Sequence, residues 1–264
     1  MARILFAVLL GLLGLILVNR MGLAHEAAMT PPVVVASAPR ATVAASPAQP
    51  IFQPSPPELA PVSGTPTIDR LAMLESRRRI LRAQGATFMD SLLASTDSIL
   101  RRWPDRSGQP LRVFLALASL PVPYPDMPGL IRGALDQWEN TGVGLRFEIV
   151  ADSNAADIRV RWIDHFDLDR VGQADIQWSP DGTIRSALVT LAVKSANGGL
   201  LPPDALKAVA AHEFGHAVGL AHSGNPKDVM FGTTRVPVLS ARDRSTLTLL
   251  YTLPPGSIRD VGAR

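Results

Sequence analysis

HEFGHAVGLAH, residues 212–222, contains three of the five histidines in this chain of 264 residues. On a helix, His212 and His216 would lie about 6 Å apart along the axis and on nearly the same face, so both rings can reach one ion. Gly219 can take the left-handed conformation that ends a helix, which lets the chain turn so that His222 returns toward the other two rings. Three imidazoles leave the fourth position of a tetrahedral zinc ion open to water, as in catalytic sites.

Glu213 follows the first of these histidines directly. Zinc lowers the pKa of a coordinated water to about 7 and polarises a peptide carbonyl, and a neighbouring carboxylate can accept the water proton and deliver it to the leaving amine. We therefore predict one catalytic zinc ion, with Glu213 as general base and acid. The alternative for a bare HExxH pattern is a surface helix with two unrelated histidines, and Gly219 and His222 weigh against it. The ligand helix is expected to run from Pro203 to Gly219.

Beyond the histidines, the sequence resembles the matrixin branch of the metzincin clan of zinc proteases. Ser223 follows the third histidine, Asp228-Val229-Met230 stands where the clan has its Met-turn, and residues 239–251 are similar to the matrixin C-terminal helix. The resemblance covers about residues 103–253. It implies that Met230 lies beneath the three imidazoles. It also implies an α+β fold, with a mixed twisted sheet of about five strands, an antiparallel edge strand and three helices.

The local patterns follow the same order. Residues 127–140 have the periodicity of an amphipathic helix, and strand patterns occur at 111–117, 145–150, 158–162, 172–178 and 184–193. Ser179-Pro180-Asp181-Gly182 predicts a tight turn between the last two strands. In the resembled family the first of this pair is the edge strand along the cleft. The resemblance thus implies that the segment carrying Gly172, Ala174 and Ile176 binds an extended substrate by main-chain pairing.

Three departures from the family stand out. The chain has no cysteine, which excludes the pro-region thiolate that holds animal matrixins latent. Residues 164–169 offer one histidine and three aspartates. The alternatives there are a structural calcium site and a solvated turn, and three aspartates on one loop more often form the turn. Residues 231–239, which in the family form a wall of the S1′ pocket, are a short segment.

The N-terminal part differs in composition from the rest. Residues 4–18 are an unbroken apolar run, which fits the hydrophobic region of a secretory signal and is short for a spanning helix. Cleavage would give a secreted or periplasmic protein, and retention would give a membrane tether through residues 4–18. We predict residues 1–24 as a signal peptide or signal anchor, 25–67 as a Pro/Ala-rich disordered linker, 68–102 as an amphipathic helical segment and 103–264 as a matrixin-like catalytic domain.

The segment 68–102 carries a stripe of apolar residues at helical spacing, which predicts that a helix there packs on another surface. The members of the stripe are Leu71, Leu74, Leu81, Phe88, Leu92 and Ile99. One alternative is a helix docked on the catalytic domain or a self-associating stalk, and the other is a pro-segment that covers the cleft. We favour the first, because the segment has no evident group that could block zinc.

Charge argues against nucleic acid as a partner. The formal net charge is only +3. The densest cationic cluster consists of Arg77, Arg78, Arg79 and Arg82. Because no aromatic residues are interleaved with these arginines, we favour a solvated helix face over a nucleic-acid surface. The sequence as a whole predicts a zinc metalloendopeptidase that hydrolyses extracytoplasmic proteins or peptides, such as those of the extracellular matrix. The alternative is a catalytically inactive zinc-binding protein that captures peptides or acts as an envelope scaffold.

Overall fold

The computed structural model describes residues 67–167, 170–233 and 236–259. All described residues lie within Pro61–Arg264, one compact unit of the chain. Its helices are α2 (Thr67–Arg82), α3 (Met89–Ser95), α4 (Met127–Glu139), α5 (Pro203–Ala217) and α6 (Ala241–Thr252). Its strands are β1 (Ile99–Leu100), β2 (Leu111–Leu115), β3 (Phe147–Val150), β4 (Ile158–Ile163), β5 (Gly172–Trp178), β6 (Ile184–Ala192) and β7 (Gly256–Ser257).

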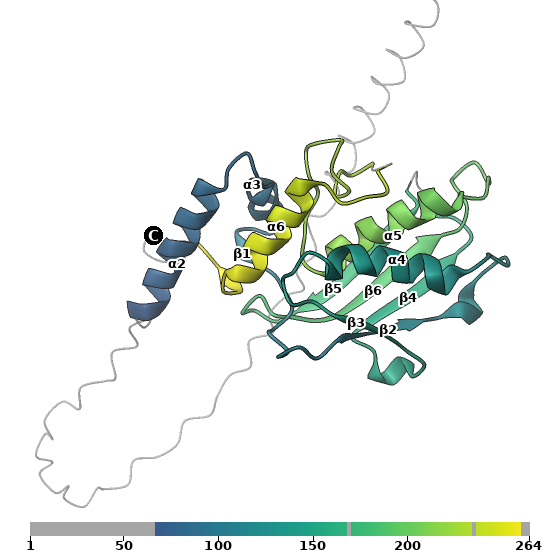
Figure 1. Ribbon diagram of the computed structural model, residues 1–264, viewed down its shortest axis with the longest axis horizontal. Coiled ribbons are helices and arrows are strands. Elements are labelled where there is room, and N and C mark those ends of the chain that lie inside the picture. The colour runs from purple at the N-terminus through teal and green to yellow at the C-terminus, as the bar shows by residue number, and fades with distance from the viewer. Residues whose placement is uncertain (1–66, 168–169, 234–235, 260–264) are drawn as a thin grey trace, which may run out of the picture. The chain divides into compact units, whose positions relative to one another are not determined.

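A five-stranded mixed sheet forms the centre of this unit, in the order β3-β2-β4-β6-β5 (Figure 1). The first four strands are parallel, and β5 pairs antiparallel with β6, with Gly172 opposite Leu191 and Ile176 opposite Ala187. The predicted turn is present, since Gly182 N–H donates to Ser179 O at 2.8 Å. The predicted α+β class, with its antiparallel edge strand, is confirmed.

Helices α4 and α5 lie next to each other over the sheet (Figure 1). The fully buried Trp138 of α4 joins them, because its indole N–H donates to Ala211 O of α5 at 2.8 Å. α5 is buried along almost its whole length, including His212 and Phe214. A helix with so little exposed surface is held in place from several sides, which suits an element that must position functional side chains.

The segment 68–102, expected to be helical with Gly85 as its weak point, is not one continuous helix. α2 ends at Arg82, Gly85 takes a φ of +81°, and the chain continues as the short α3 and β1. The stripe divides accordingly: Phe88 and Leu92 enter the core, whereas the side chains of Leu71 and Leu81 are 62% and 61% exposed. The expectation that the whole stripe packs was therefore wrong, because the bend turns its two halves in different directions.

This segment packs on α6 and β7. The Phe88 N–H donates to the Thr246 hydroxyl at 3.1 Å, and β1 pairs antiparallel with β7. Predictions about the signal region, the linker and the tether at residues 4–18 concern positions outside the described residues. In the described part of the chain, no helix is long and apolar enough to cross a membrane.

Candidate metal centre

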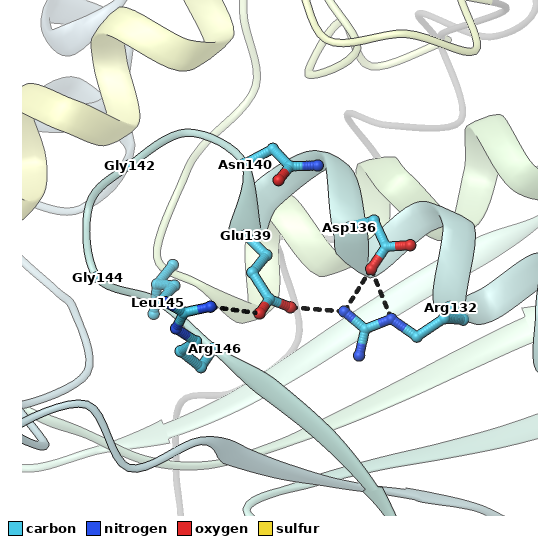
Figure 2. Close-up of a pocket in the computed structure, with 8 residues that line it drawn as sticks. All are labelled: Arg132, Asp136, Glu139, Asn140, Gly142, Gly144, Leu145 and Arg146. Atoms are coloured by element: carbon cyan, nitrogen blue, oxygen red, sulfur yellow. Dashed lines mark hydrogen bonds and ion pairs between the residues drawn. The ribbon is translucent and has the colours of Figure 1, made fainter.

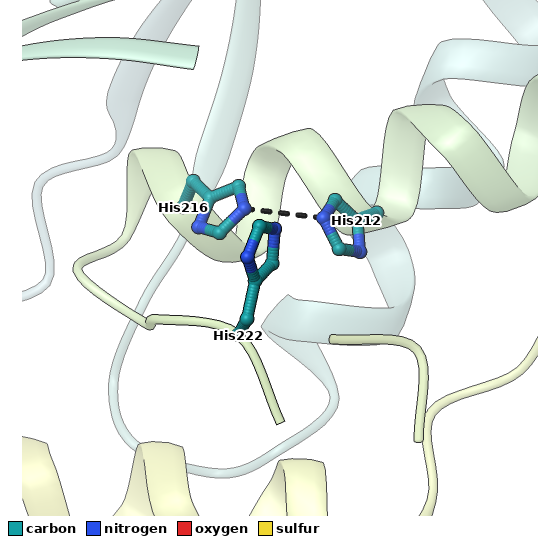
Figure 3. Close-up of side chains that lie close together, drawn as sticks. All are labelled: His212, His216 and His222. Atoms are coloured by element: carbon teal, nitrogen blue, oxygen red, sulfur yellow. Dashed lines mark hydrogen bonds between the residues drawn. The ribbon is translucent and has the colours of Figure 1, made fainter. Parts of the chain in front are cut away.

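The three histidines of the HEFGHAVGLAH stretch converge, as their spacing predicts. His212 and His216 project from the last turns of α5, and His222 approaches them from the loop that follows (Figure 3). Their ligand nitrogens all lie within 4.8 Å of one another. Gly219 has a φ of +103°, and a Cβ there would collide with the Arg101 carbonyl, so only glycine fits where the chain turns back.

Hydrogen bonds fix which nitrogens face the centre. His212 Nδ1 lies 2.6 Å from Val229 O, and His216 Nδ1 lies 2.8 Å from Leu220 O. Since a carbonyl only accepts, each Nδ1 carries the hydrogen and each Nε2 keeps its lone pair. The two Nε2 atoms are 3.1 Å apart, so two lone pairs point into one space. A cation between them satisfies this arrangement, and imidazole is a ligand type that zinc favours.

Burial keeps these rings neutral. It lowers the pKa of His212 to about 4 and that of His216 to about 3, with neighbouring histidines acting in the same direction and the hydrogen bonds to carbonyls opposing. Burial also lowers the pKa of His222. Neutral imidazole is the form that binds metal, so the fold prepares all three ligands at neutral pH. Within the described ranges, this trio is the one group of three or more potential ligands found.

The Glu213 carboxyl lies beside β5. A Cβ placed on Gly172 would collide with Glu213 Oε1, so the glycine makes room for the carboxyl. Burial raises the pKa of Glu213 to about 8, with the negative charge of Asp175 adding to the effect and the positive charge of Arg170 opposing it. A cation held by the histidines would favour the carboxylate, because opposite charges at short range lower an acid's pKa.

Met230 packs against α5 at Gly215, and its expected place beneath the three imidazoles stays a prediction. It is completely buried, and a Cβ on Gly215 would collide with its sulfur. The turn that carries it is held by the buried Asp243, whose carboxylate accepts from Val229 N–H at 2.9 Å and Met230 N–H at 3.3 Å. The same carboxylate caps α6 with Ser240. The Ser240-x-x-Asp243 spacing is typical of a capping box and could have indicated this role from sequence.

Gly172, Ala174 and Ile176 lie on β5, which is the edge of the sheet nearest Glu213. The acidic loop before it is engaged in ion pairs: Asp164 Oδ1 lies 2.6 Å from Lys194 Nζ. Asp169 lies outside the described residues. The calcium alternative for this loop therefore stays a prediction.

A separate hollow of about 620 Å³ lies at the C-terminal end of α4 and contains none of the predicted site residues (Figure 2). Its charges are paired with each other. Arg132 contacts Asp136 and Glu139, and Glu139 also lies 3.6 Å from Arg146. This hollow offers no cluster of unpaired groups comparable to the histidine centre.

Comparison with known proteins agrees with this geometry. Residues 194–252 match the family model described as Matrixin. A 54-residue stretch is 43% identical to matrilysin of Felis catus, covering 20% of this chain and 17% of that protein. The stretch matched to matrilysin thus spans about a sixth of that protein's length. Residues 194–252, matched by the family model, include the histidines of α5, the loop with His222 and the turn with Met230. Residues 194–252 are thus similar to the matrixin family.

Proposed function

We propose that the protein is a zinc-dependent endopeptidase that cleaves extracytoplasmic proteins or peptides. The observation that carries the proposal is the convergence of His212, His216 and His222 next to the buried carboxyl of Glu213. Zinc bound there would lower the pKa of water and polarise the scissile carbonyl. The assignment to extracytoplasmic substrates rests on the apolar run at residues 4–18.

The chain's own residues have three tasks in this mechanism. The histidines present lone pairs, fixed by their bonds to Val229 O and Leu220 O. Glu213 accepts a proton from the attacking water and returns it to the leaving amine, and its burial suits a group that is protonated for part of the cycle. β5 holds the substrate as an added antiparallel strand, which would bring a main-chain carbonyl toward the histidines.

A Glu213→Gln substitution tests the role of the carboxylate. We expect kcat to fall by about 10²–10⁴-fold on a denatured protein substrate, because the proton acceptor is lost. Zinc content should stay unchanged, since the three ligands remain. The exposed Glu148 provides the matched control, and Glu148→Gln should cleave at the wild-type rate.

The outcomes separate enzyme from binding protein. Chelator-sensitive fragments from the wild type, lost in Glu213→Gln, support an endopeptidase. Peptide binding without any fragments from the zinc-loaded wild type would favour peptide capture instead. Full activity in Glu213→Gln would contradict the assigned mechanism.

A further inference from the structure

The solvent-facing side of α2 combines leucines with arginines. Three of its leucines are exposed, by 62% at Leu71, 36% at Leu74 and 61% at Leu81. Three exposed arginines share this side, and at helical spacing all six residues fall within about 120° around the axis. We call this set the outer face of α2; it consists of Arg70, Leu71, Leu74, Arg78, Leu81 and Arg82.

Contacts on the opposite side hold the outer face toward solvent. Ser76 and Ile80 are buried. Arg77 Nε donates to Ile258 O at 2.7 Å, and Arg79 Nη1 donates to Thr252 O at 3.0 Å. α2 is therefore fixed in rotation by polar and apolar contacts to the C-terminal part of the domain, and the leucines cannot turn inward without breaking them.

The chemistry of this face fits one kind of partner. Leucines and arginines are interleaved around this exposed helix side, so it offers apolar groups to the acyl boundary of a membrane and cations to the headgroup phosphates above it. Guanidinium groups suit phosphate because they donate paired hydrogen bonds. Among the side chains of α2 that the structure describes, the one acid is Glu75 at the border of the face. It lies 3.9 Å from Arg78, and the three arginines leave the face cationic.

A second copy of the chain fits this face less well. Two copies related by a two-fold axis would set the same patch against itself. The arginine cluster of one copy would then face the same cluster of the other, and like charges brought together in an interface repel; the cluster is Arg70, Arg78 and Arg82. Charge complementarity thus favours an anionic surface over self-association.

We propose that the outer face of α2 docks on a bilayer of anionic phospholipid. α6 lies between α2 and α5 (Figure 1): Arg79 of α2 donates to Thr252 O of α6, and Tyr251 of α6 donates to Val218 O at the end of α5. Because the outer face of α2 points away from these contacts, docking through it would leave α5 and its histidines on the far side of α6. The proposal does not depend on the protease assignment. It concerns an element outside residues 194–252, the part that matches the matrixin model.

Vesicle co-sedimentation tests the docking with residues 61–264, a fragment that contains the whole described core but lacks the apolar run at 4–18. We expect binding to phosphatidylglycerol-containing vesicles to exceed binding to phosphatidylcholine vesicles by at least about tenfold, and to weaken with added salt. The Leu71→Ser, Leu74→Ser, Leu81→Ser variant should lose about tenfold or more in affinity. Circular dichroism melts will show that this variant is folded.

Matched controls keep the outcome specific. Leu200 is 60% exposed elsewhere on the domain, and Leu200→Ser should bind like the wild type. Two triple arginine-to-glutamine variants remove the same charge from different exposed positions. Vesicle binding should fall more in the variant at Arg70, Arg78 and Arg82 than in the control variant at Arg146, Arg159 and Arg185. No binding by the wild type, or equal binding by the triple leucine variant, would overturn the proposal. A dimer that the leucine substitutions abolish would assign the face to a second copy and also overturn it.

Discussion

The lack of a side chain at Gly172 determines where the Glu213 carboxyl can lie. A Cβ at position 172 would overlap Oε1 and approach the rest of the carboxyl group. The two residues are on different elements, β5 and α5, so the contact joins the edge strand of the sheet to the helix that carries His212 and His216. A small substitution at Gly172 should therefore displace the Glu213 carboxyl, the proposed proton acceptor.

We predict that Gly172→Ala lowers kcat/KM by about 10²-fold, since displacing a catalytic group by about 1 Å can have that effect. Zinc content should remain at the wild-type level, because no histidine is touched. Gly224→Ala is the control, since a Cβ there meets nothing within 4 Å. Unchanged kinetics in Gly172→Ala would show that the carboxyl is placed by other contacts.

The raised pKa of Glu213 makes the metal-free protein sensitive to pH. Its pKa is about 8 in the folded state against an ordinary 4.5, so the folded protein binds more protons than the unfolded chain between these values, and stability falls as pH rises. His212 and His216 have lowered pKa values and act in the opposite sense, but only below about pH 6.5. Between pH 6.5 and 8 the carboxyl therefore dominates.

The measurement is thermal unfolding of metal-free protein across that window. We expect the wild type to lose up to about 2 kcal/mol of stability from pH 6.5 to 8, and Glu213→Gln to lose much less. An equal loss of stability with rising pH in the wild type and in Glu213→Gln would be incompatible with a protonated, buried Glu213.

For individual residues, the predictions agree with the structure where they depend only on residues close together in the sequence. His212, His216, Gly219 and His222 could be predicted because helix geometry relates neighbours in sequence directly to neighbours in space. The Gly172–Glu213 contact could not, because it depends on how a strand far away in sequence packs on the helix. The resemblance implied that Gly172 lies on the edge strand, but not why a glycine is needed there.

Among the helices, α6 supports the turn that carries Met230, in addition to packing in the core. Its buried Asp243 accepts hydrogen bonds from Val229 and Met230, and Val229 O in turn accepts from His212 Nδ1. The helix cap, the turn and a metal ligand are thus connected in series. Asp228 extends the connection by accepting from Ser240 at 2.7 Å.

We predict that Asp243→Ala destabilises the protein by at least about 3 kcal/mol, because several buried N–H groups lose their acceptor. Affinity for zinc should fall as well, since the turn that orients His212 loosens. Chemical denaturation and zinc titration measure the two effects. The exposed Glu148 again gives a control, and Glu148→Ala should change both by little. A wild-type zinc affinity in Asp243→Ala would show that the hydrogen bonds of Asp243 do not help to orient the histidines.

Elements were predictable to different degrees. The helix expected from Pro203 to Gly219 spans Pro203–Ala217, and the strand expected at 172–178 has those bounds, because Pro, Gly and strong periodicity mark their ends. The helix expected over 68–102 is broken instead. Its apolar spacing continues through Gly85, but burial of Phe88 and Leu92 against the C-terminal part of the chain favours a bend that local periodicity does not reveal.

In the whole molecule, the segment 68–102 contributes to the hydrophobic core. Phe88, Met89, Leu92 and Leu100 are buried with the residues of the sheet and α6. The Arg101 carbonyl lies against Gly219, at the turn between the histidine ligands. A domain boundary at residue 103 remains a prediction from sequence, and this packing argues for a folded unit that begins before it.

A truncation checks this boundary. Residues 61–264 should unfold cooperatively, whereas residues 103–264 should be largely unfolded or insoluble. The truncation removes five large apolar core residues, Ile80, Phe88, Met89, Leu92 and Leu100. At about 1.5–3 kcal/mol each, their loss is comparable to the whole stability margin of a typical domain, about 5–15 kcal/mol. Differential scanning calorimetry of both fragments is the measurement. A cooperative transition in the shorter fragment would mean that the N-terminal segment is dispensable.

We propose above that three neutral imidazoles, those of His212, His216 and His222, form one zinc site. The most direct measurement is metal content by mass spectrometry of residues 61–264 after loading with zinc and removal of excess. We predict one zinc ion per chain in the wild type and a marked loss in His216→Asn, with both proteins folded by circular dichroism. A folded wild type that takes up no zinc, or a His216→Asn variant that keeps the full amount, would contradict the account.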